Sequence, residues 1–439
     1  MSEQPSTSSF YLGFTGKSRT STIAFVIGII GLAVAGYGVW QGVLHDESRP
    51  LASWLIGFTV WFSVAIGMLF IIMIWYLFDA GWPVVIRRQL EHAISVFPWL
   101  ALILLPLILI GWFNHSNPGI LWEWMNPDLL LPNGEPVGED SIYLHKSPLL
   151  NLPFFTVRFA FYFTIFTTLA WALRKSSFAM DVDGDIKWAR RARVWAAIGT
   201  PVLALTVTFA AFDYFMSLSY HWFSTIFGVW FFATSMRAAL AVTIILCTVL
   251  SLGGHLKGLF RQAHRYELGC MCLAFTIFWA YIAFSQYFLI YNANIPEETF
   301  WYNMRELFVD GSKNSWWWIG VGGLVFGYFF IPFLLLLFYR NKIIPARLIF
   351  ICCWILVFFI CDLYFNILPS KENADNVLGY VVTQFSITGF DIAAIIGVGG
   401  ICAWSFLRSA RKRAPIPFRD PRINESVFPK EEDIHHHKY

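Results

Sequence analysis

Long apolar runs recur along nearly the whole chain, separated by shorter polar stretches. A bilayer core about 30 Å thick needs roughly 20 apolar residues in a helix. Because a lipid-exposed backbone must satisfy its own hydrogen bonds, runs of this length predict helices rather than barrel strands. The pattern predicts an all-α, polytopic membrane protein with ten transmembrane helices. The predicted spans are residues 21–44, 52–78, 95–113, 150–173, 194–218, 222–252, 269–291, 316–339, 348–368 and 385–407.

The composition agrees with this interpretation. Of the 439 residues, 57% are hydrophobic, 19% are aromatic and only 13% are charged, whereas soluble domains carry about 25% charged residues. The first span is longer than the apolar region of a signal peptide and has no small-residue cleavage site, so we expect it to remain as a helix.

Basic residues gather on one side of the predicted bundle. Five of the 31 Lys and Arg residues lie in loops on one side, two lie within spans, and the other 24 lie in the alternate loops and near the two termini. Because loops rich in Lys and Arg stay in the cytoplasm, both termini are predicted to be cytoplasmic. This asymmetry explains the net charge of +3, so no nucleic-acid partner is indicated.

The predicted topology divides the chain into three parts. A cytoplasmic N-terminus (1–20) precedes the ten-helix membrane domain (21–407), which includes a long loop on the outer side (114–149). A basic cytoplasmic tail (408–439) follows, and we expect it to be solvated or to touch lipid head groups. The three histidines at 435–437 are too short a run to predict a metal site.

The sequence predicts no metal and no ligated cofactor. None of the ten histidines lies in the middle of a span, and no Cys-x-x-Cys-His motif is present, so haem is not expected. The seven cysteines all fall within spans without the spacing of an iron–sulfur or zinc site, which favours packing. No phosphate-binding Gly-rich loop precedes a Lys-Ser or Lys-Thr pair, so nucleotide-driven transport is not indicated.

Polar side chains within the spans are the candidates for function, because a charge inside a bilayer is costly and needs a partner. By helical rise, Arg158 and Asp213 lie at matching depths, roughly 8 to 12 Å from the outer side, on consecutive antiparallel helices. The same arithmetic adds five further residues to a polar layer in the outer third of the bundle: Asp362, Asp391, Gln286, Ser285 and Tyr281.

This layer has two interpretations. Arg158 and Asp213 form either a buried ion pair that fixes helix register or part of a working site. Because one Arg compensates only one of the three carboxylates, we expect the others to exchange protons near neutral pH. The layer then serves either a quinol site with aromatic walls or a proton wire. Arg237 and Asp79 lie closer to the cytoplasm and are predicted to belong to the cytoplasmic side of a proton path.

The fifth and ninth spans end in similar sequences. The fifth ends Ala-Phe-Asp213-Tyr-Phe and the ninth ends Cys-Asp362-Leu-Tyr-Phe, and the two spans are four helices apart. This repetition predicts a duplicated four-helix bundle, residues 52–218 and 222–368, with a chance match among aromatic-rich helices as the alternative.

Two long segments resemble the F subunit of bacterial alternative complex III, a quinol:cytochrome c oxidoreductase. They are FDYFMSLSYHWFSTIFG (212–228) and FWAYIAFSQYFLIYNANIPEETFWY (278–302), and the ten-span topology agrees over the whole chain. The resemblance implies the polysulfide-reductase (NrfD-like) superfamily, two four-helix bundles plus flanking helices, and the bacterial inner (plasma) membrane. It also implies these partners: a paralogous NrfD-like C subunit, an iron–sulfur subunit, multihaem and monohaem c-type cytochrome subunits, membrane lipids and, as an option, a terminal oxidase.

In this family the C subunit is the stronger candidate for the working quinol site. The resemblance therefore implies that this chain is a cofactor-free, non-catalytic or quinone-binding subunit. It would scaffold the membrane arm and contribute a proton path or a surface for menaquinone or ubiquinone. The family has an acidic residue and a proline before the His-Trp pair, but here Ser219 and Tyr220 precede His221. This departure favours a connecting role for His221.

Two outer-side segments are candidates for contact with partner subunits. Glu297 and Glu298 follow Pro296 just outside the seventh span, and the loop 114–149 carries five acidic residues and one lysine. Both are either solvated or docking surfaces, and we favour docking, with the loop facing periplasmic cytochromes.

The rival function is a stand-alone secondary transporter. Such a protein has helices broken by Gly and Pro in corresponding positions of two halves. Pro332 in the eighth span is one break, but the fourth span has no counterpart.

Overall fold

The computed structural model describes residues 19–131, 134–306, 312–368, 371–373, 380–382, 384–411 and 413–427. Within these residues, ten helical stretches are long and apolar enough to cross a membrane. The protein is therefore an all-α, multi-pass membrane protein, as the sequence predicts. Most of the predicted N-terminal segment and the histidines at 435–437 lie outside the described residues.

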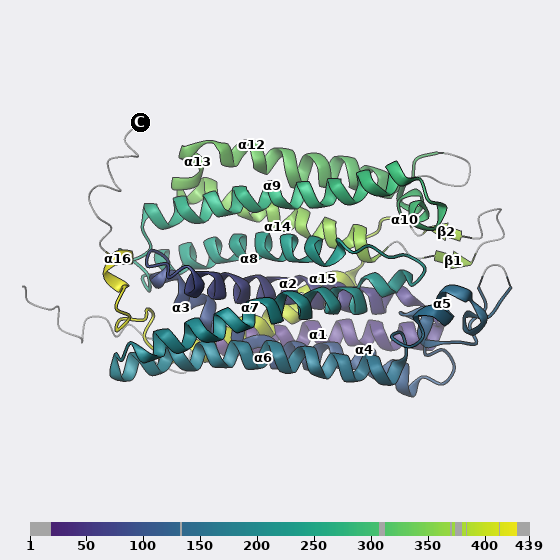
Figure 1. The fold of residues 1–439 in the computed structure, drawn as a ribbon, viewed down its shortest axis with the longest axis horizontal. Helices are drawn as coiled ribbons and strands as arrows, with labels where there is room; N and C mark the ends of the chain where they lie inside the picture. Colours follow the sequence, from purple (N-terminus) through teal and green to yellow (C-terminus); the bar gives the residue numbers. More distant parts are fainter. Residues whose placement is uncertain are drawn as a thin grey trace, which may run out of the picture.

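The helices run side by side along the length of an elongated bundle (Figure 1). The α-helices are α1 (Arg19–His45), α2 (Ser48–Leu77), α3 (Val84–Ala93), α4 (Phe97–Phe113), α5 (Ser141–Lys146), α6 (Leu152–Asp183), α7 (Lys187–Tyr214), α8 (Phe227–Leu252), α9 (Gln262–Ala293), α10 (Pro296–Glu306), α11 (Ser315–Trp318), α12 (Ile331–Leu337), α13 (Tyr339–Ile343), α14 (Pro345–Ile367), α15 (Gly389–Ala410) and α16 (Ile423–Val427). Short 3-10 turns are η2 (Ile94–Val96), η3 (Glu123–Met125), η4 (Val137–Glu139) and η5 (Met216–Ser219), and η6 (Ile319–Phe330) is a π-helix. Two antiparallel strands, β1 (Lys371–Asn373) and β2 (Tyr380–Val382), complete the elements.

The two ends of the bundle carry different elements. Helix α16 lies at one end, and α5, α10 and the β1–β2 pair lie at the other (Figure 1). We call these the α16 end and the α5 end. The α16 end is the one where α1 begins and α15 finishes, so it corresponds to the side that the sequence predicts to be cytoplasmic.

Helix α2 forms the centre of the bundle. Its apolar window is 94% buried, which is typical of a helix that is hydrophobic on every face. On one side it packs with α4, α6 and α7, and on the other it packs against α8. Helix α8 joins the second group, which contains α9, η6, α12 and α14.

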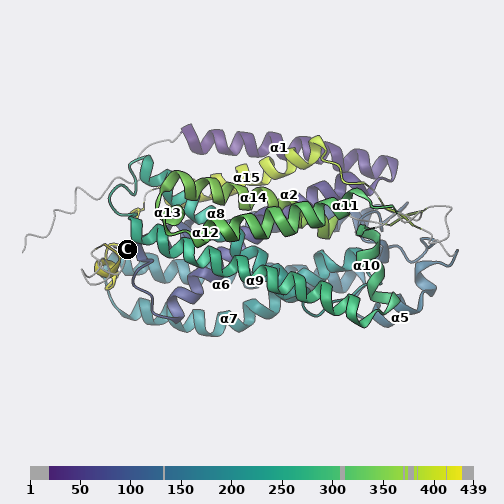
Figure 2. The same cartoon turned by 90° about the horizontal axis from the view of Figure 1, so that it is seen from above.

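Helices α1 and α15 pack together along one face of the bundle, where Figure 2 shows α1 outermost. Glycines permit their close approach. A Cβ atom added to Gly31 would lie 2.6 Å from Cα of Gly397, and one added to Gly400 would lie 2.5 Å from Cα of Gly28. Both distances are shorter than real Cβ atoms tolerate, so these positions need glycine.

The third span begins earlier than the sequence predicts. Helix α3 is buried from residue 84 to residue 92, and it continues through η2 into α4. The polar residues before residue 95 resemble an exposed amphipathic connection, but their charged side chains are paired inside the protein. The tenth span begins at Gly389 rather than at 385, and the fourth extends to Asp183.

The beginning of the tail packs on the bundle, contrary to the expectation of a solvated segment. Ile416, Asp420 and Ser426 are buried. The amide of Gln89 donates to the Pro415 carbonyl at 2.7 Å. The tail from 413 to 427 is therefore part of the folded α16 end.

Candidate functional site

A cavity of about 630 Å³ opens between α6 and α7 near the α5 end. Most of its lining is aliphatic or aromatic, including Phe161 and Phe212. Its polar or charged lining side chains are Lys146, Arg158, Tyr162, Asp213, Ser217 and Tyr220.

Arg158 and Asp213 meet in this cavity, as their matching depths on α6 and α7 predict. Nε of Arg158 donates to Oδ2 of Asp213 at 2.7 Å, and Nη2 donates to Oδ1 at 3.0 Å. The hydroxyl of Tyr162 donates to Oδ2 at 2.8 Å. This two-pronged geometry is the strong form of an Arg–carboxylate pair. The side chains of Arg158 and Asp213 keep 13% and 12% of their surface exposed.

Two cations hold the rim of the cavity in place. Nη1 of Arg158 donates to the Leu149 carbonyl at 2.8 Å. Nζ of Lys146 donates to the carbonyl of Tyr220 at 2.5 Å, and burial lowers the pKa of this ammonium group. The loop before α6 and the loop after α7 are therefore tied to the same site.

His221 connects these loops rather than lining the cavity. Asp140 caps α5 by accepting from the Ile142 amide at 3.1 Å, and its Oδ2 lies 2.6 Å from Nε2 of His221 and accepts from the Tyr220 hydroxyl at 2.9 Å. Burial alone would raise the pKa of Asp140, but these hydrogen bonds outweigh it and lower the pKa below its usual value. The geometry agrees with the connecting role that the sequence favours.

Asp362 lies in a different place, among α8, α9 and α14. Its Oδ2 accepts from the Thr234 hydroxyl at 3.1 Å and from the Trp279 indole at 3.0 Å, and its Oδ1 accepts from the Asn366 amide at 3.2 Å. Among the described residues, no Lys or Arg lies within ion-pair distance of it.

Arg237 belongs to this second group and does not pair with Asp79. Its guanidinium lies 3.9 Å from the ring centre of Tyr328 and donates to the carbonyl of the same residue. Asp79 pairs instead with Arg193 and Arg422 at the α16 end. Helical rise gives depth but not the direction in which a side chain points, and Arg237 points toward η6 and α9.

Asp391 forms a third, separate pair. Nη2 and Nη1 of Arg49 donate to its two oxygens at 2.6 and 2.8 Å. Asp391 also forms a capping box with Thr388 at the start of α15. The expectation that Asp391 has no compensating Arg is therefore wrong, because Arg49, which the sequence places in a loop, is a residue of α2 and pairs with it.

Gln286, Ser285 and Tyr281 do not contact these carboxylates. The oxygen of Gln286 accepts from Ser224 at 3.1 Å and its nitrogen donates to Tyr302 at 3.1 Å, which fixes α9 to the loop before α8 and to α10. Ser285 is half-buried, and Tyr281 is 65% exposed and points out of the bundle. The predicted polar layer is thus several local groups.

Glu297 and Glu298 lie in the first turn of α10 at the α5 end. Glu297 is exposed and Glu298 is half-buried. Acidic residues are favoured at this position by the helix dipole, so their presence has a structural cause whether or not a partner docks there.

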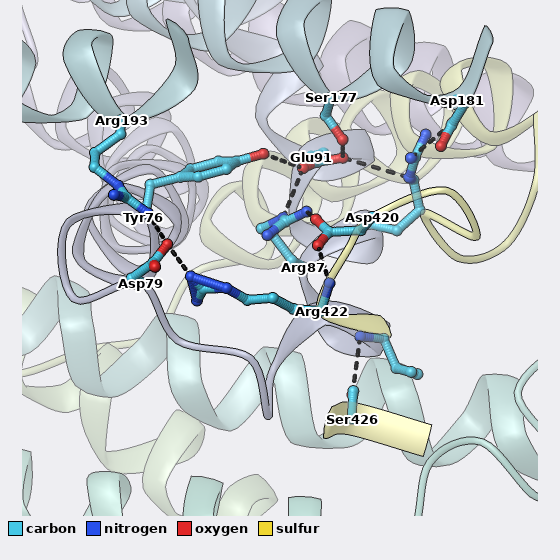
Figure 3. Close-up of polar contacts among 12 residues, drawn as sticks. Tyr76, Asp79, Arg87, Glu91, Ser177, Asp181, Arg193, Asp420, Arg422 and Ser426 are labelled. Atoms are coloured by element: carbon cyan, nitrogen blue, oxygen red, sulfur yellow. Dashed lines mark hydrogen bonds and ion pairs between the residues drawn. The ribbon is translucent and has the colours of Figure 1, made fainter. Parts of the chain in front are cut away.

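A buried charge cluster at the α16 end was not predicted. Figure 3 shows Glu91 at its centre. The Glu91 carboxylate accepts from Ser177 at 2.7 Å, from Arg87 at 3.2 Å and from Tyr76 at 3.3 Å, and Arg88 lies 3.4 Å away. Three charged residues within five positions, directly before an apolar run, are the sequence signal that could have indicated it.

The tail closes this cluster. Asp420 pairs with Arg87, and Arg422 pairs with Asp79, which also pairs with Arg193 of α7 (Figure 3). These contacts join α2, α3, α7 and the tail at the α16 end.

Among the residues that the structure describes, no three His, Cys, Asp or Glu side chains gather closely enough to hold a metal ion. Compared with known proteins, the chain matches no family model and no curated sequence. The cavity between α6 and α7 is therefore considered below as a candidate site for a small organic molecule.

Proposed function

We propose that the chain is an integral membrane subunit of a quinol:cytochrome c oxidoreductase of the alternative complex III type, and that the cavity between α6 and α7 binds a quinone head group. The observation that carries the proposal is one aromatic-walled cavity with Arg158, Tyr162 and Asp213 at its polar part. The resemblance of segments 212–228 and 278–302 supplies the type of complex.

The cavity suits a quinone in size and in access. Small-molecule sites are commonly about 300–1,000 Å³ and mostly apolar, with a few placed polar groups, and this one is about 630 Å³. Phe161, Val157 and Phe209 line it and are also exposed on the side of the bundle. A hydrophobic molecule can therefore enter from the lipid, with its isoprenoid tail left along the exposed helix faces.

The polar groups suit both redox forms of the ring. A quinone carbonyl accepts hydrogen bonds from Arg158 or Tyr162, and a quinol hydroxyl donates to Asp213. Oxidation of a quinol releases two electrons and two protons. In the proposed complex the electrons pass to iron–sulfur or haem groups in partner subunits, while this chain binds and orients the ring. Menaquinone and ubiquinone share the two ring oxygens, so both fit the proposal.

The proposed orientation places the α5 end on the periplasmic side of a bacterial inner membrane. Basic residues are concentrated in the segments at the α16 end, which favours a cytoplasmic position for that end. The cavity, Glu297 and the loop 114–149 would then face the periplasmic partners: the iron–sulfur subunit and the c-type cytochromes. The paralogous C subunit would lie beside this chain in the membrane.

Purification in a mild detergent tests the complex. We expect c-type haem absorbance to elute together with this chain. A colourless protein that elutes alone would contradict the proposed complex and favour the transporter.

Photolabelling with an azido-quinone tests the site within the purified assembly. We expect label on peptides of α6 and α7, and we expect Val157→Trp to abolish it by filling the cavity. Val157 is 62% exposed and lines the cavity, whereas Val194 is 57% exposed on α7 outside it, so Val194→Trp is the matched control. Labelling that survives Val157→Trp, or that maps to other helices, would exclude this cavity as the quinone site.

A further inference from the structure

A second cavity, of about 460 Å³, lies near the α16 end between η2, the start of α4, α6 and α15. Its lining is strongly basic. Four of its eight lining residues are arginines, three are serines and one is a tryptophan. The arginines are Arg174, Arg408, Arg411 and Arg413.

Arg174 presents a donor without an acceptor in this cavity. Its Nη2 donates to the Ser409 hydroxyl at 2.8 Å, and Ser409 is held from the other side by Nδ1 of His92 at 2.9 Å. Its Nε is buried and, within the described part of the chain, has no hydrogen-bond partner. A buried unpaired N–H is costly and rare in native proteins, and the same guanidinium lines the cavity, where its positive charge favours an acceptor from outside the chain.

Among the described residues, no carboxylate forms an ion pair with any of the four arginines that line the cavity. Glu91 and Asp181 are the acidic residues close to this region, but both pair with Arg88. Among the described ion pairs, none involves Arg408 or Arg411, and both residues are exposed. The acceptor is therefore expected to be anionic.

The cavity also lies at a boundary between polar and apolar surface. The indole rings of Trp99 and Trp404 meet at 4.9 Å beside it, and Arg408 lies 5.2 Å from the Trp404 ring centre. Tryptophan is enriched where a membrane meets water. Leu102, exposed on α4, lies seven residues beyond Ser95 and so about 10 Å deeper along the helix axis. An apolar chain attached to an anion in the cavity would lie along this exposed apolar face of α4.

We propose that this cavity binds the phosphate group of an anionic phospholipid. Arginine forks match phosphate oxygens in two-pronged geometry, and basic pockets between transmembrane helices bind lipid head groups. A soluble phosphate shares this chemistry, but it would gain nothing from the adjacent tryptophans and exposed apolar helix faces. The site is remote from the proposed quinone cavity and does not depend on that function.

Titration of the purified full chain with phosphatidylglycerol, read by native mass spectrometry, tests the proposal. Replacing two basic residues near a membrane surface loses about fivefold in affinity for each, so Arg408→Gln with Arg411→Gln should weaken binding about 25-fold. The lysine pair at these positions should retain most of the binding. Arg190→Gln with Arg191→Gln, an exposed basic pair on α7 at the same end, is the matched control and should bind within about twofold of the unaltered protein.

Three results would overturn the proposal. Equal loss in the α7 control pair would mean that only the overall charge attracts the lipid. Equal binding of zwitterionic phosphatidylcholine would mean that the arginines do not select an anion. Displacement of the lipid by inorganic phosphate, with direct phosphate binding lost in the Arg408 and Arg411 variant, would assign the site to a soluble anion. Circular dichroism and size-exclusion profiles that match the unaltered protein establish that each variant is folded.

Discussion

Replacing Asp213 by Asn tests whether the Arg158–Asp213 ion pair is only structural or also takes part in quinone binding. The change keeps the shape of the side chain but removes its charge, which leaves the Arg158 guanidinium without a counter-charge inside the bundle. Asp362→Asn is the matched control, because Asp362 accepts only from neutral donors: Thr234, Trp279 and Asn366.

The structure sets the expected size of the effect. Two unit charges about 4 Å apart interact by about 4 kcal/mol at an effective dielectric constant of 20, and removing one member of a buried pair costs about 3–5 kcal/mol. Because Arg158 and Asp213 keep 13% and 12% exposure, we expect the low end, about 3 kcal/mol of unfolding free energy. Asp362→Asn keeps an oxygen for Thr234 and Trp279, so we expect a loss of about 1 kcal/mol.

The assay is the unfolding free energy of the full chain in bicelles, measured for five proteins. These are the unaltered chain, Asp213→Asn, Arg158→Gln, the double variant of these two, and the control Asp362→Asn. The double variant should be more stable than the sum of the two single losses predicts, because it buries no unpaired charge. Quinol-dependent turnover of the assembled complex is measured in parallel, and we expect Asp213→Asn to lower it while assembly survives.

Two outcomes would refute this reasoning. If Asp213→Asn costs no more stability than Asp362→Asn, the ion pair does not carry the stability that its geometry implies. If less complex assembles with Asp213→Asn but turnover per assembled complex is unchanged, the pair is purely structural and takes no part in quinone binding.

Two further predictions concern other parts of the fold. Gly31→Ala should destabilise the protein by about 1–3 kcal/mol, because its Cβ would lie 2.6 Å from Cα of Gly397; Gly322→Ala, with nothing within 4 Å of its Cβ, should be close to neutral in the same thermal unfolding assay. The hydrogen bonds that lower the pKa of Asp140 stabilise the loop fully when the pH is above the pKa of an unfolded Asp, about 4. This stabilisation is lost as the pH falls through the lower pKa that Asp140 has in the folded protein. The protection of the Ile142 amide against hydrogen exchange should therefore fall below about pH 4. Asp140→Asn should remove that pH dependence while leaving the protection of amides in α2 unchanged.

The sequence was sufficient for the number of spans and for one contact of the site. Apolar length alone identifies ten spans because the bilayer fixes how long each helix must be. Depth along the helices was sufficient to pair Arg158 with Asp213 because α6 and α7 are consecutive helices joined by a short connection, residues 184–186, at the α16 end. Two side chains at equal depth on adjacent antiparallel helices lie close enough to pair.

Depth was insufficient elsewhere because it does not give helix rotation or partner choice. Asp391 has its own partner in Arg49, a residue more than 300 positions earlier, since α15 packs beside α2. Tyr281 lies at the expected depth but points out of the bundle. The charges of α3 resemble a surface face, and only the later folding of the tail against them shows why they are buried.

The packing of tail residues 413–427 against α3 has a consequence for the synthesis of the protein. Arg87 and its partner Asp420 are 333 residues apart, and Asp420 follows the tenth span, so the ribosome has made all ten spans before that counter-ion exists. The first spans must therefore enter the membrane before Arg87 has met this partner, when only its pair with Glu91 of the same helix can form. A chain truncated before residue 420 lacks both Asp420 and Arg422, so the contacts of the tail with Arg87 and Asp79 would be lost.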